Sequence, residues 1–237
     1  MKTVPVRVAW LGEQDCRNCS IRKSALFTGL CEVNFGEIHR PIEDIMLEPH
    51  TMLYRIAERG QAIFTLRRGL IKLVKYLPDG NQRIVRLLRH SDTLGLEALV
   101  NQPYTHNAIA LTHCEVCVIP TTLVEQLGHT QPQIYQELML RWQQALTEAD
   151  HWLAEFSTGT ARQRVARLLL HLTSTDNEQP VLLLLGREDM GAMLGITTET
   201  VSRTIAELRR AGFIQENKPN KLITNLPQLR RIAEGLN

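Results

Sequence analysis

Between residues 35 and 128, short apolar stretches alternate with turns built from glycine, proline and aspartate. The apolar stretches at 63–66 and 70–74 are separated by a glycine turn, and a Pro-Asp-Gly-Asn turn at 78–81 precedes the next one. Stretches of this length that recur about every ten residues are typical of antiparallel strands. The pattern therefore predicts an antiparallel β-roll or barrel over 35–128, which a further β segment at 108–119 closes.

A different pattern covers residues 133–156, which contain no glycine or proline and carry apolar side chains every three or four positions. This spacing predicts a long helix with a coiled-coil seam, which we expect to be a dimer interface. An ordinary amphipathic helix has similar spacing, but the position between two domains favours a dimer spine. Leu146 and Leu153 widen the apolar face, so we expect the helix also to pack on its own β domain. The predicted interface residues are Leu138, Trp142, Ala145, Ala149 and Trp152.

Residues 157–160 end this helix and begin a second domain, placed at 157–237. Two helices, at 188–194 and 198–211, flank a turn that contains Gly195, and two short strands follow them. A glycine can supply the positive φ that such a turn needs. The arrangement has the register of a helix-turn-helix followed by a wing.

The second helix of this motif carries polar side chains that suit the edges of DNA bases. Arginine can donate twice to guanine, glutamate can accept from cytosine, and serine or threonine can meet a thymine or a phosphate. A single helix of this kind is more often a packing element. The turn glycine, the apolar spacing, the polar set and the wing together favour DNA binding. The residues predicted to contact DNA are Thr197, Thr198, Glu199, Ser202, Arg203 and Arg209.

With these motifs the chain resembles the CRP/FNR superfamily of bacterial transcription regulators. Residues 198–203 read Thr-Glu-Thr-Val-Ser-Arg, which matches the Glu-x-x-Ser-Arg signature of the FNR-like branch. The cAMP-receptor branch has glycine at the position of Ser202. The segments 80–84 and 117–120 also look FNR-like, and the resemblance covers most of the chain.

The resemblance implies an α+β chain with an antiparallel β-roll, which is a cupin-like jelly roll of the cyclic-nucleotide-binding-domain type. The expected domains are a cysteine-bearing segment (1–34), the sensor roll (35–128), the dimerisation helix (129–156) and a winged helix-turn-helix (157–237). It also implies a homodimer that binds promoter DNA at a palindrome close to TTGAT-N4-ATCAA and works with RNA polymerase.

Composition agrees with a DNA-binding regulator. Apolar residues make up 43% of the 237 residues and charged residues 22%, as in ordinary soluble globular proteins. The longest aliphatic run is far shorter than a membrane span, and no signal peptide is evident, so we expect a cytoplasmic protein without membrane contact. Lys and Arg outnumber Asp and Glu within residues 157–237, which is a weak hint of a polyanionic partner there. No Ser-His-Asp order, phosphate loop or His-Glu-x-x-His motif suggests an enzyme.

The first candidate signal is a cyclic nucleotide, whose phosphate needs an arginine. The family places it in an Arg-Ser pair after a Gly-Glu-Leu segment. Here the segment at 94–99 is followed by Tyr104 and Thr105 at the Arg-Ser position, and no Arg or Lys lies between Arg89 and Arg141. Without a cation to pair the phosphate, we do not expect cAMP to bind.

The second candidate is an iron–sulfur cluster. FNR-like oxygen sensors hold a [4Fe-4S] cluster with three N-terminal cysteines and one from the β-roll. The resemblance makes Cys16, Cys19 and Cys117 ligands. Cys31 is the candidate for the third N-terminal ligand, although it lies further along the chain than in the sensors. Cys114 should point to the opposite face of its strand from Cys117, because side chains alternate.

Three alternatives to the cluster stay open at this point. The first is a thiol-based redox switch, or a metal site at Cys16 and Cys19 without a full cluster. A haem would need an axial histidine. Finally, the cysteines can lack a sensing role, with a constitutive dimer or an unknown small ligand in the roll. The candidate haem ligands are His39, His50, His90, His106 and His113.

Overall fold

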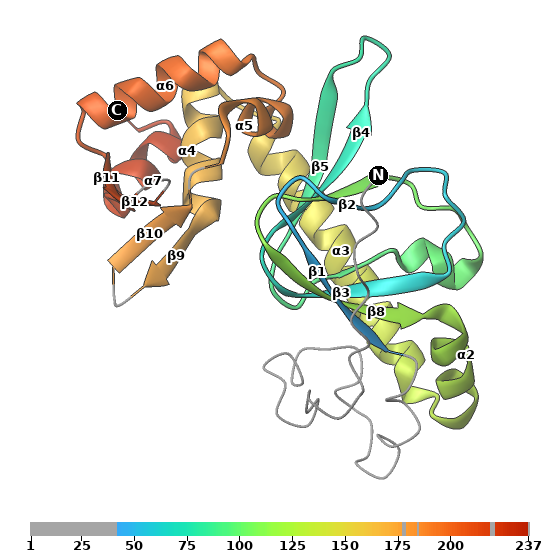
Figure 1. Ribbon diagram of the computed structural model, residues 1–237. Helices are drawn as coiled ribbons and strands as arrows, with labels where there is room; N and C mark the ends of the chain where they lie inside the picture. Colours follow the sequence, from blue (N-terminus) through green and yellow to red (C-terminus); the bar gives the residue numbers. More distant parts are fainter. Residues whose placement is uncertain (1–41, 177–178, 184, 219–220, 237) are drawn as a thin grey trace. The chain divides into compact units, whose positions relative to one another are not determined.

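A computed structural model describes residues 42–176, 179–183, 185–218 and 221–236 (Figure 1). Contacts divide the described chain into two compact units. The first runs from Ile42 to Lys75 and from Val85 to Thr147, and the second contains Tyr76–Ile84 and the chain from Glu148 onward. Among the helices of these described residues, none is long and apolar enough to cross a membrane.

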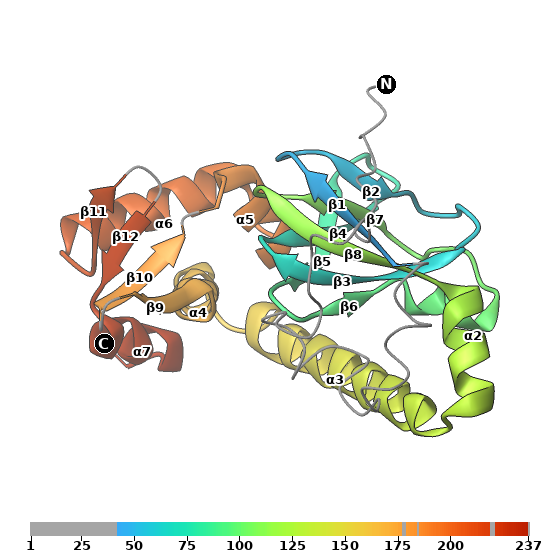
Figure 2. The same ribbon diagram turned by 60° about the horizontal axis from the view of Figure 1, so that its bottom comes forward.

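Two four-stranded sheets form the roll that the alternating pattern predicts. One has the order β1-β8-β3-β6 and the other the order β2-β7-β4-β5, with antiparallel pairing in each (Figure 2). The strands of the first sheet are β1 (Glu43–Leu47), β3 (Ala62–Arg68), β6 (Thr93–Leu94) and β8 (Cys114–Pro120). Those of the second are β2 (Met52–Tyr54), β4 (Ile71–Tyr76), β5 (Gln82–Leu88) and β7 (Asn107–Ala110).

Side chains from both sheets meet in one apolar core. Alternation along β8 places Cys114 and Val116 in it, and β3 contributes Phe64 and Leu66. Because successive side chains of a strand point to opposite faces, the remaining residues of these strands lie on the outer face of the first sheet. That outer face is where the second core forms.

The second core joins the outer face of the first sheet to helices. Ile63 and Ile119 from the sheet pack with Ile134 and Leu138. These two belong to α3 (Gln133–Phe156), and α2 (Thr121–Thr130) adds further apolar side chains. Helix α2 lies partly within the range predicted for the β-roll, and the long helix begins only at Gln133.

The second unit is a winged helix with more strands than expected. Its strands β9 (Thr173–Asp176), β10 (Gln179–Leu183), β11 (Ile214–Lys218) and β12 (Lys221–Thr224) form a sheet of order β11-β12-β10-β9. The predicted two-stranded wing is thus extended by β10, which pairs with β12 and β9. The helices are α4 (Ala161–Leu172), α5 (Arg187–Leu194), α6 (Thr198–Arg210) and α7 (Leu226–Glu234).

Candidate nucleic-acid interface and sensor surface

Helices α5 and α6 meet at the turn that the sequence predicts. Gly195 ends α5 in the left-handed conformation with φ 63°, and Ile196 N–H donates to Gly191 O at 3.2 Å. A Cβ on Gly191 would lie 2.7 Å from Ile196 O, so any side chain there would collide with the turn. Both glycines are therefore required by the backbone of the helix-turn-helix.

Helix α6 separates a buried face from an exposed one. Val201, Ile205 and Leu208 are buried against the rest of the unit. The predicted base-contacting side chains of Thr198, Glu199, Ser202 and Arg203 are all exposed, as is that of Arg209 in the last turn. The remaining predicted residue, Thr197, caps the helix, because its Oγ1 accepts from Thr200 N–H at 3.2 Å.

Arg187 is a further cation near this surface, beyond the residues that the sequence predicts to contact DNA. It is the first residue of α5. Burial, and to a smaller extent the positive charge of Arg209, lowers the pKa of Arg187 below its ordinary value. The positive charge of Arg187 is therefore close enough to that of Arg209 for the two to repel each other. Its place at the start of the first helix of the motif was the signal available in the sequence.

The apolar side chains of α3 are divided between two stripes. Leu138 belongs to the second core, and Trp152 packs edge-on against Phe156 with ring centroids 4.7 Å apart. Both were predicted at a dimer interface, and both are buried within the chain. Trp142 is 39% exposed, and Ala145 and Ala149 are partly exposed. The exposed large apolar side chains of α3 are Tyr135, Met139, Leu140, Trp142, Leu146 and Leu153.

The predicted packing of the helix on its own β domain is confirmed, because Ile134 and Leu138 lie in the second core. It does not use Leu146 and Leu153, which are 63% and 66% exposed. An α-helix has 3.6 residues per turn, a value between three and four. A spacing of three and four positions therefore fits either of two adjacent stripes on the helix surface. Packing within the chain takes one stripe and leaves the other in solvent.

Cys114 and Cys117 lie on opposite faces of β8, as expected from alternation. Cys114 is buried in the first core, and its Sγ donates to Leu70 O and Thr112 O at 3.2 Å each. Burial raises the pKa of this thiol. Cys117 is half-buried on the outer face. Cys16, Cys19 and Cys31 lie outside the described residues.

Cys117 stands in a row of polar side chains across the first sheet. Its register partners are Asp44 on β1 and Thr65 on β3, and Thr65 in turn pairs with Thr93 on β6. The hydroxyls of Thr65 and Thr93 are buried and have no hydrogen-bond partner among the described residues. A buried hydroxyl without a partner costs free energy, so this row suits a polar or charged ligand.

Tyr104 and Thr105, which stand at the expected Arg-Ser position, both contact other residues of the roll. Tyr104 stacks on Tyr54 with ring centroids 4.0 Å apart, and its hydroxyl donates to Ala62 O at 2.8 Å. Thr105, at the second position of the expected Arg-Ser pair, donates from its hydroxyl to Glu97 Oε1 at 2.8 Å. The partner of Thr105 is thus a carboxylate, which offers no positive charge to a phosphate.

The histidines considered as haem ligands mostly have polar partners, and the other side chains that could bind a metal do not come together in one place. His90 Nδ1 lies 2.6 Å from Arg67 O, His106 Nδ1 lies 2.8 Å from Thr105 Oγ1, and His113 Nδ1 lies 3.0 Å from Glu48 Oε2. Within residues 42–176, 179–183, 185–218 and 221–236, no three His, Cys, Asp or Glu side chains come together as a metal site. His39 lies outside that part of the chain, and His50 adopts a positive φ of 67°.

Comparisons with known proteins agree with this geometry. A cyclic nucleotide-binding domain model matches residues 45–131, and a Crp-like helix-turn-helix domain model matches residues 163–232. A probable transcriptional activator of Rhizobium leguminosarum bv. viciae is 29% identical over 227 residues, 93% of each chain. The transcriptional activator protein anr of Pseudomonas aeruginosa is 24% identical over 97% of each chain. The structure of FixK2 from Bradyrhizobium japonicum shares the fold, with a TM-score of 0.72 and 22% identity over 81% of this chain and 96% of that one.

Proposed function

The chain belongs to the CRP/FNR superfamily of transcription regulators, and we propose that it binds promoter DNA as a homodimer whose activity follows oxygen or redox state. It carries a DNA-binding helix-turn-helix, and the relatives it matches are named as regulators rather than enzymes. The observation that carries the proposal is the exposed polar face of α6, which presents Glu199, Ser202 and Arg203 together.

The DNA site follows from this face and from two-fold symmetry. Two recognition helices of a symmetric dimer enter successive major grooves one helical turn apart, so the site is a palindrome. The Glu-x-x-Ser-Arg segment resembles that of the FNR-like branch, which supports a site near TTGAT-N4-ATCAA. Arg187 and Arg209 supply positive charge for phosphates beside the bases. RNA polymerase is the partner at the promoter.

The dimer forms along the exposed stripe of α3. Tyr135, Met139, Trp142, Leu146 and Leu153 follow a spacing of four and three positions, with Ala149 in the remaining place. A heptad stripe of this kind, exposed in one chain, is buried when two helices pack as a coiled coil. Trp142 and Ala149 thus keep the role that the sequence predicts for them, and Ala145 flanks the stripe.

The proposed sensor is a [4Fe-4S] cluster bound by Cys16, Cys19, Cys31 and Cys117. Cys117 fits a ligand, since it is half-buried in a polar row with two unpartnered hydroxyls. Thr65 and Thr93 would donate hydrogen bonds toward sulfur, which tune such groups. The cluster would supply sensitivity to oxygen. A relative from Aggregatibacter actinomycetemcomitans is named an anaerobic regulatory protein, which agrees with this proposal.

The deciding experiment is purification of the full chain without oxygen, followed by absorbance, iron and sulfide analysis. We expect a broad band near the blue edge of the visible range and about four iron and four sulfide per chain. DNA binding should then weaken in air. A sharp Soret band would indicate haem instead, and a colourless protein whose DNA binding responds to thiol oxidants would indicate a thiol switch. A colourless protein that ignores both oxygen and oxidants would leave a small ligand or a constitutive dimer.

A further inference from the structure

The carboxyl end of α3 lacks the usual means of ending a helix. Its last turn contains no basic residue, and the nearest following glycine in the left-handed conformation is Gly159 with φ 83°, three residues beyond the end. The last four carbonyl groups of any helix have no partner within it, and they carry partial negative charge. The end of α3 therefore needs donors from elsewhere in the chain.

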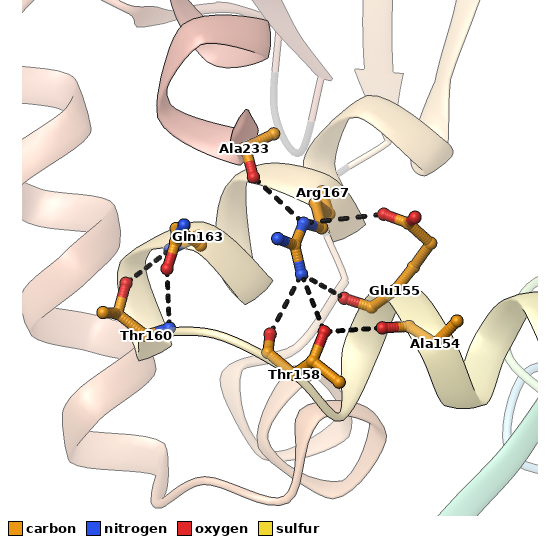
Figure 3. A network of polar contacts seen from close by, with 7 residues as sticks. All are labelled: Ala154, Glu155, Thr158, Thr160, Gln163, Arg167 and Ala233. Atoms are coloured by element: carbon orange, nitrogen blue, oxygen red, sulfur yellow. Dashed lines mark hydrogen bonds and ion pairs between the residues drawn. The ribbon is translucent and has the colours of Figure 1, made fainter. Parts of the chain in front are cut away.

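Arg167 of α4 provides these donors (Figure 3). Its Nη1 donates to Glu155 O and to Thr158 O, each at 2.9 Å. Thr158 Oγ1 in turn donates to Ala154 O at 2.6 Å. Two of the final carbonyls of α3 are thus bound by side chains beyond the helix, and the guanidinium brings the positive charge that a helix end favours.

The same guanidinium also binds α7. Arg167 Nε donates to Ala233 O of α7 at 3.1 Å and lies 3.5 Å from Glu155 Oε2. Its side chain is only 18% exposed, so water competes little for these contacts. One side chain therefore joins α3, the link at 157–160, α4 and α7.

The other end of the link is fixed as well. Thr160 and Gln163 form a reciprocal capping box, with Gln163 N–H donating to Thr160 Oγ1 at 3.2 Å and Thr160 N–H donating to Gln163 Oε1 at 2.8 Å. Figure 3 shows both capped ends of the link together. The residues between the helices are therefore held at each side, although the sequence predicts a domain boundary there.

A second residue of α4, one turn after Arg167, extends the contact along α3. The ring of His171 meets those of Trp152 and Phe156 edge-on, with centroids 5.8 Å and 5.4 Å apart. Its Nε2 lies 3.9 Å from Glu148 Oε1. The contacts from Arg167 and His171 thus cover the helix from Glu148 to Phe156, the part of α3 that belongs to the second unit.

We infer that Arg167 is a positioning residue that locks the carboxyl end of α3 to the DNA-binding domain, so that both move as one body. A change in α3 is then passed to α6 without being lost in the link at 157–160. The inference rests on the proposed dimeric role of α3. Arg167 does not touch DNA, so its effect on binding comes from where it holds α6.

The test uses the full chain and two measurements. The first is binding to duplexes in which the space between the half-sites varies from about three to seven base pairs, with a single half-site for comparison. The second is hydrogen exchange of the amides at 155–163. In Arg167→Ala we expect the preference for one spacing to fall about tenfold, with unchanged single half-site affinity, and link amides to exchange about tenfold faster.

Three further variants make the comparison sharp. Arg162→Ala removes another arginine of α4, whose Nε pairs with Glu207 Oε1 at 3.2 Å, and should keep the parent's spacing preference and exchange. Arg167→Lys keeps the positive charge but not the planar guanidinium, so its spacing preference should lie between those of the parent and Arg167→Ala. Thr158→Val changes an exposed residue, and should show the same effects in weaker form even if Arg167→Ala does not fold.

The two measurements separate the inference from the proposed function. A parent protein without any spacing preference would overturn the proposed symmetric dimer. Link amides that exchange at the parent rate in both Arg167→Ala and Thr158→Val would overturn the inference, whatever the DNA titration gives. A third outcome concerns a parent protein that does prefer one spacing. If the link amides of Arg167→Ala exchange faster but this variant keeps the full spacing preference, the inference also fails.

Discussion

The ring of Tyr104 lies against the ring of Tyr54 inside the β-roll, with centroids 4.0 Å apart and planes inclined by 23°. Phe64 extends the stack, at 5.5 Å from Tyr54. These rings fill the interior of a domain that matches the cyclic nucleotide-binding model. The roll therefore has an apolar, aromatic core at this point.

The buried tyrosines predict a loss of stability at alkaline pH. Burial raises the pKa of both Tyr54 and Tyr104, and the charge of Glu97 adds to the rise. A raised folded-state pKa gives a contribution that is fully present below the unfolded value of about 10 and is lost as pH rises further. Urea unfolding between about pH 8 and 11 should show the decline. Tyr54→Phe should reduce the slope by up to about 1.4 kcal/mol per pH unit, whereas equal slopes would contradict the assignment.

The opposite orientations of the two β-roll cysteines predict different behaviour on mutation. Cys117→Ala and Cys19→Ala should each abolish binding of the proposed cluster, whereas Cys114→Ala should retain it, because Cys114 faces the first core. Iron and sulfide content of anaerobically purified variants measures this. Equal iron in these three variants and the parent would rule out the proposed ligand set.

Thiol reactivity gives an independent check on the same strand. Iodoacetamide should modify Cys117 faster than Cys114 in the folded chain without metal, because burial raises the pKa of the Cys114 thiol. Peptide mass mapping separates the two sites, and unfolded protein, in which both react at similar rates, is the control. Faster modification of Cys114 would show that the strand faces are assigned wrongly.

The sequence predicts well what depends on neighbouring residues. Strict alternation along β8 is sufficient to place Cys114 and Cys117 on opposite faces, and the turn of the helix-turn-helix follows from Gly195 and its apolar neighbours. The capping box of Thr160 and Gln163 is equally local, because a cap involves residues within one turn.

What the sequence does not predict depends on distant partners. The 3-4 spacing of α3 cannot tell which stripe faces the chain itself, and only the packing of Leu138 and Trp152 decides it. The pairing of β10 with β12 was not foreseen, because it depends on a contact across the second unit. Helix α7 was missed although its signals are local, since Asn225 caps it and a proline follows in the first turn. Arg167 looks like an ordinary helix arginine until Ala233 is brought beside it.

The exposed stripe of α3 predicts which substitutions weaken the dimer. Ala149→Glu and Leu146→Glu should each place like charges in the apolar interface and give monomers or much weaker dimers. Gln144→Glu adds the same charge two positions from Leu146, about 200° around the helix, and should leave the dimer intact. Sedimentation velocity of the three variants measures the association. An unchanged dimer in the first two would show that another surface of the chain forms the interface.

The exposed face of α6 predicts how the half-site is distinguished. Arg203 should donate to O6 and N7 of the guanine, and Glu199 should accept from the amino group of the paired cytosine or a neighbouring one. Arg203→Ala should then cost about 1–3 kcal/mol per half-site and relax discrimination at that guanine. Ser202→Gly should shift preference toward the half-site TGTGA, since glycine stands there in the cAMP-receptor branch.

Arginines at the far end of α6 provide the matched control for this test. Arg209 and Arg210 occupy its last turn, so they should meet phosphates rather than bases. Their replacement by alanine should weaken binding to all sequences alike and reduce its salt dependence, because phosphate contacts release counterions without reading sequence. A competition titration over all single-base variants of the half-site, at fixed salt, separates the two effects. If Arg203→Ala lowers affinity uniformly and keeps the base ranking, α6 does not contact the guanine through Arg203, and the proposed register of the helix in the groove is wrong.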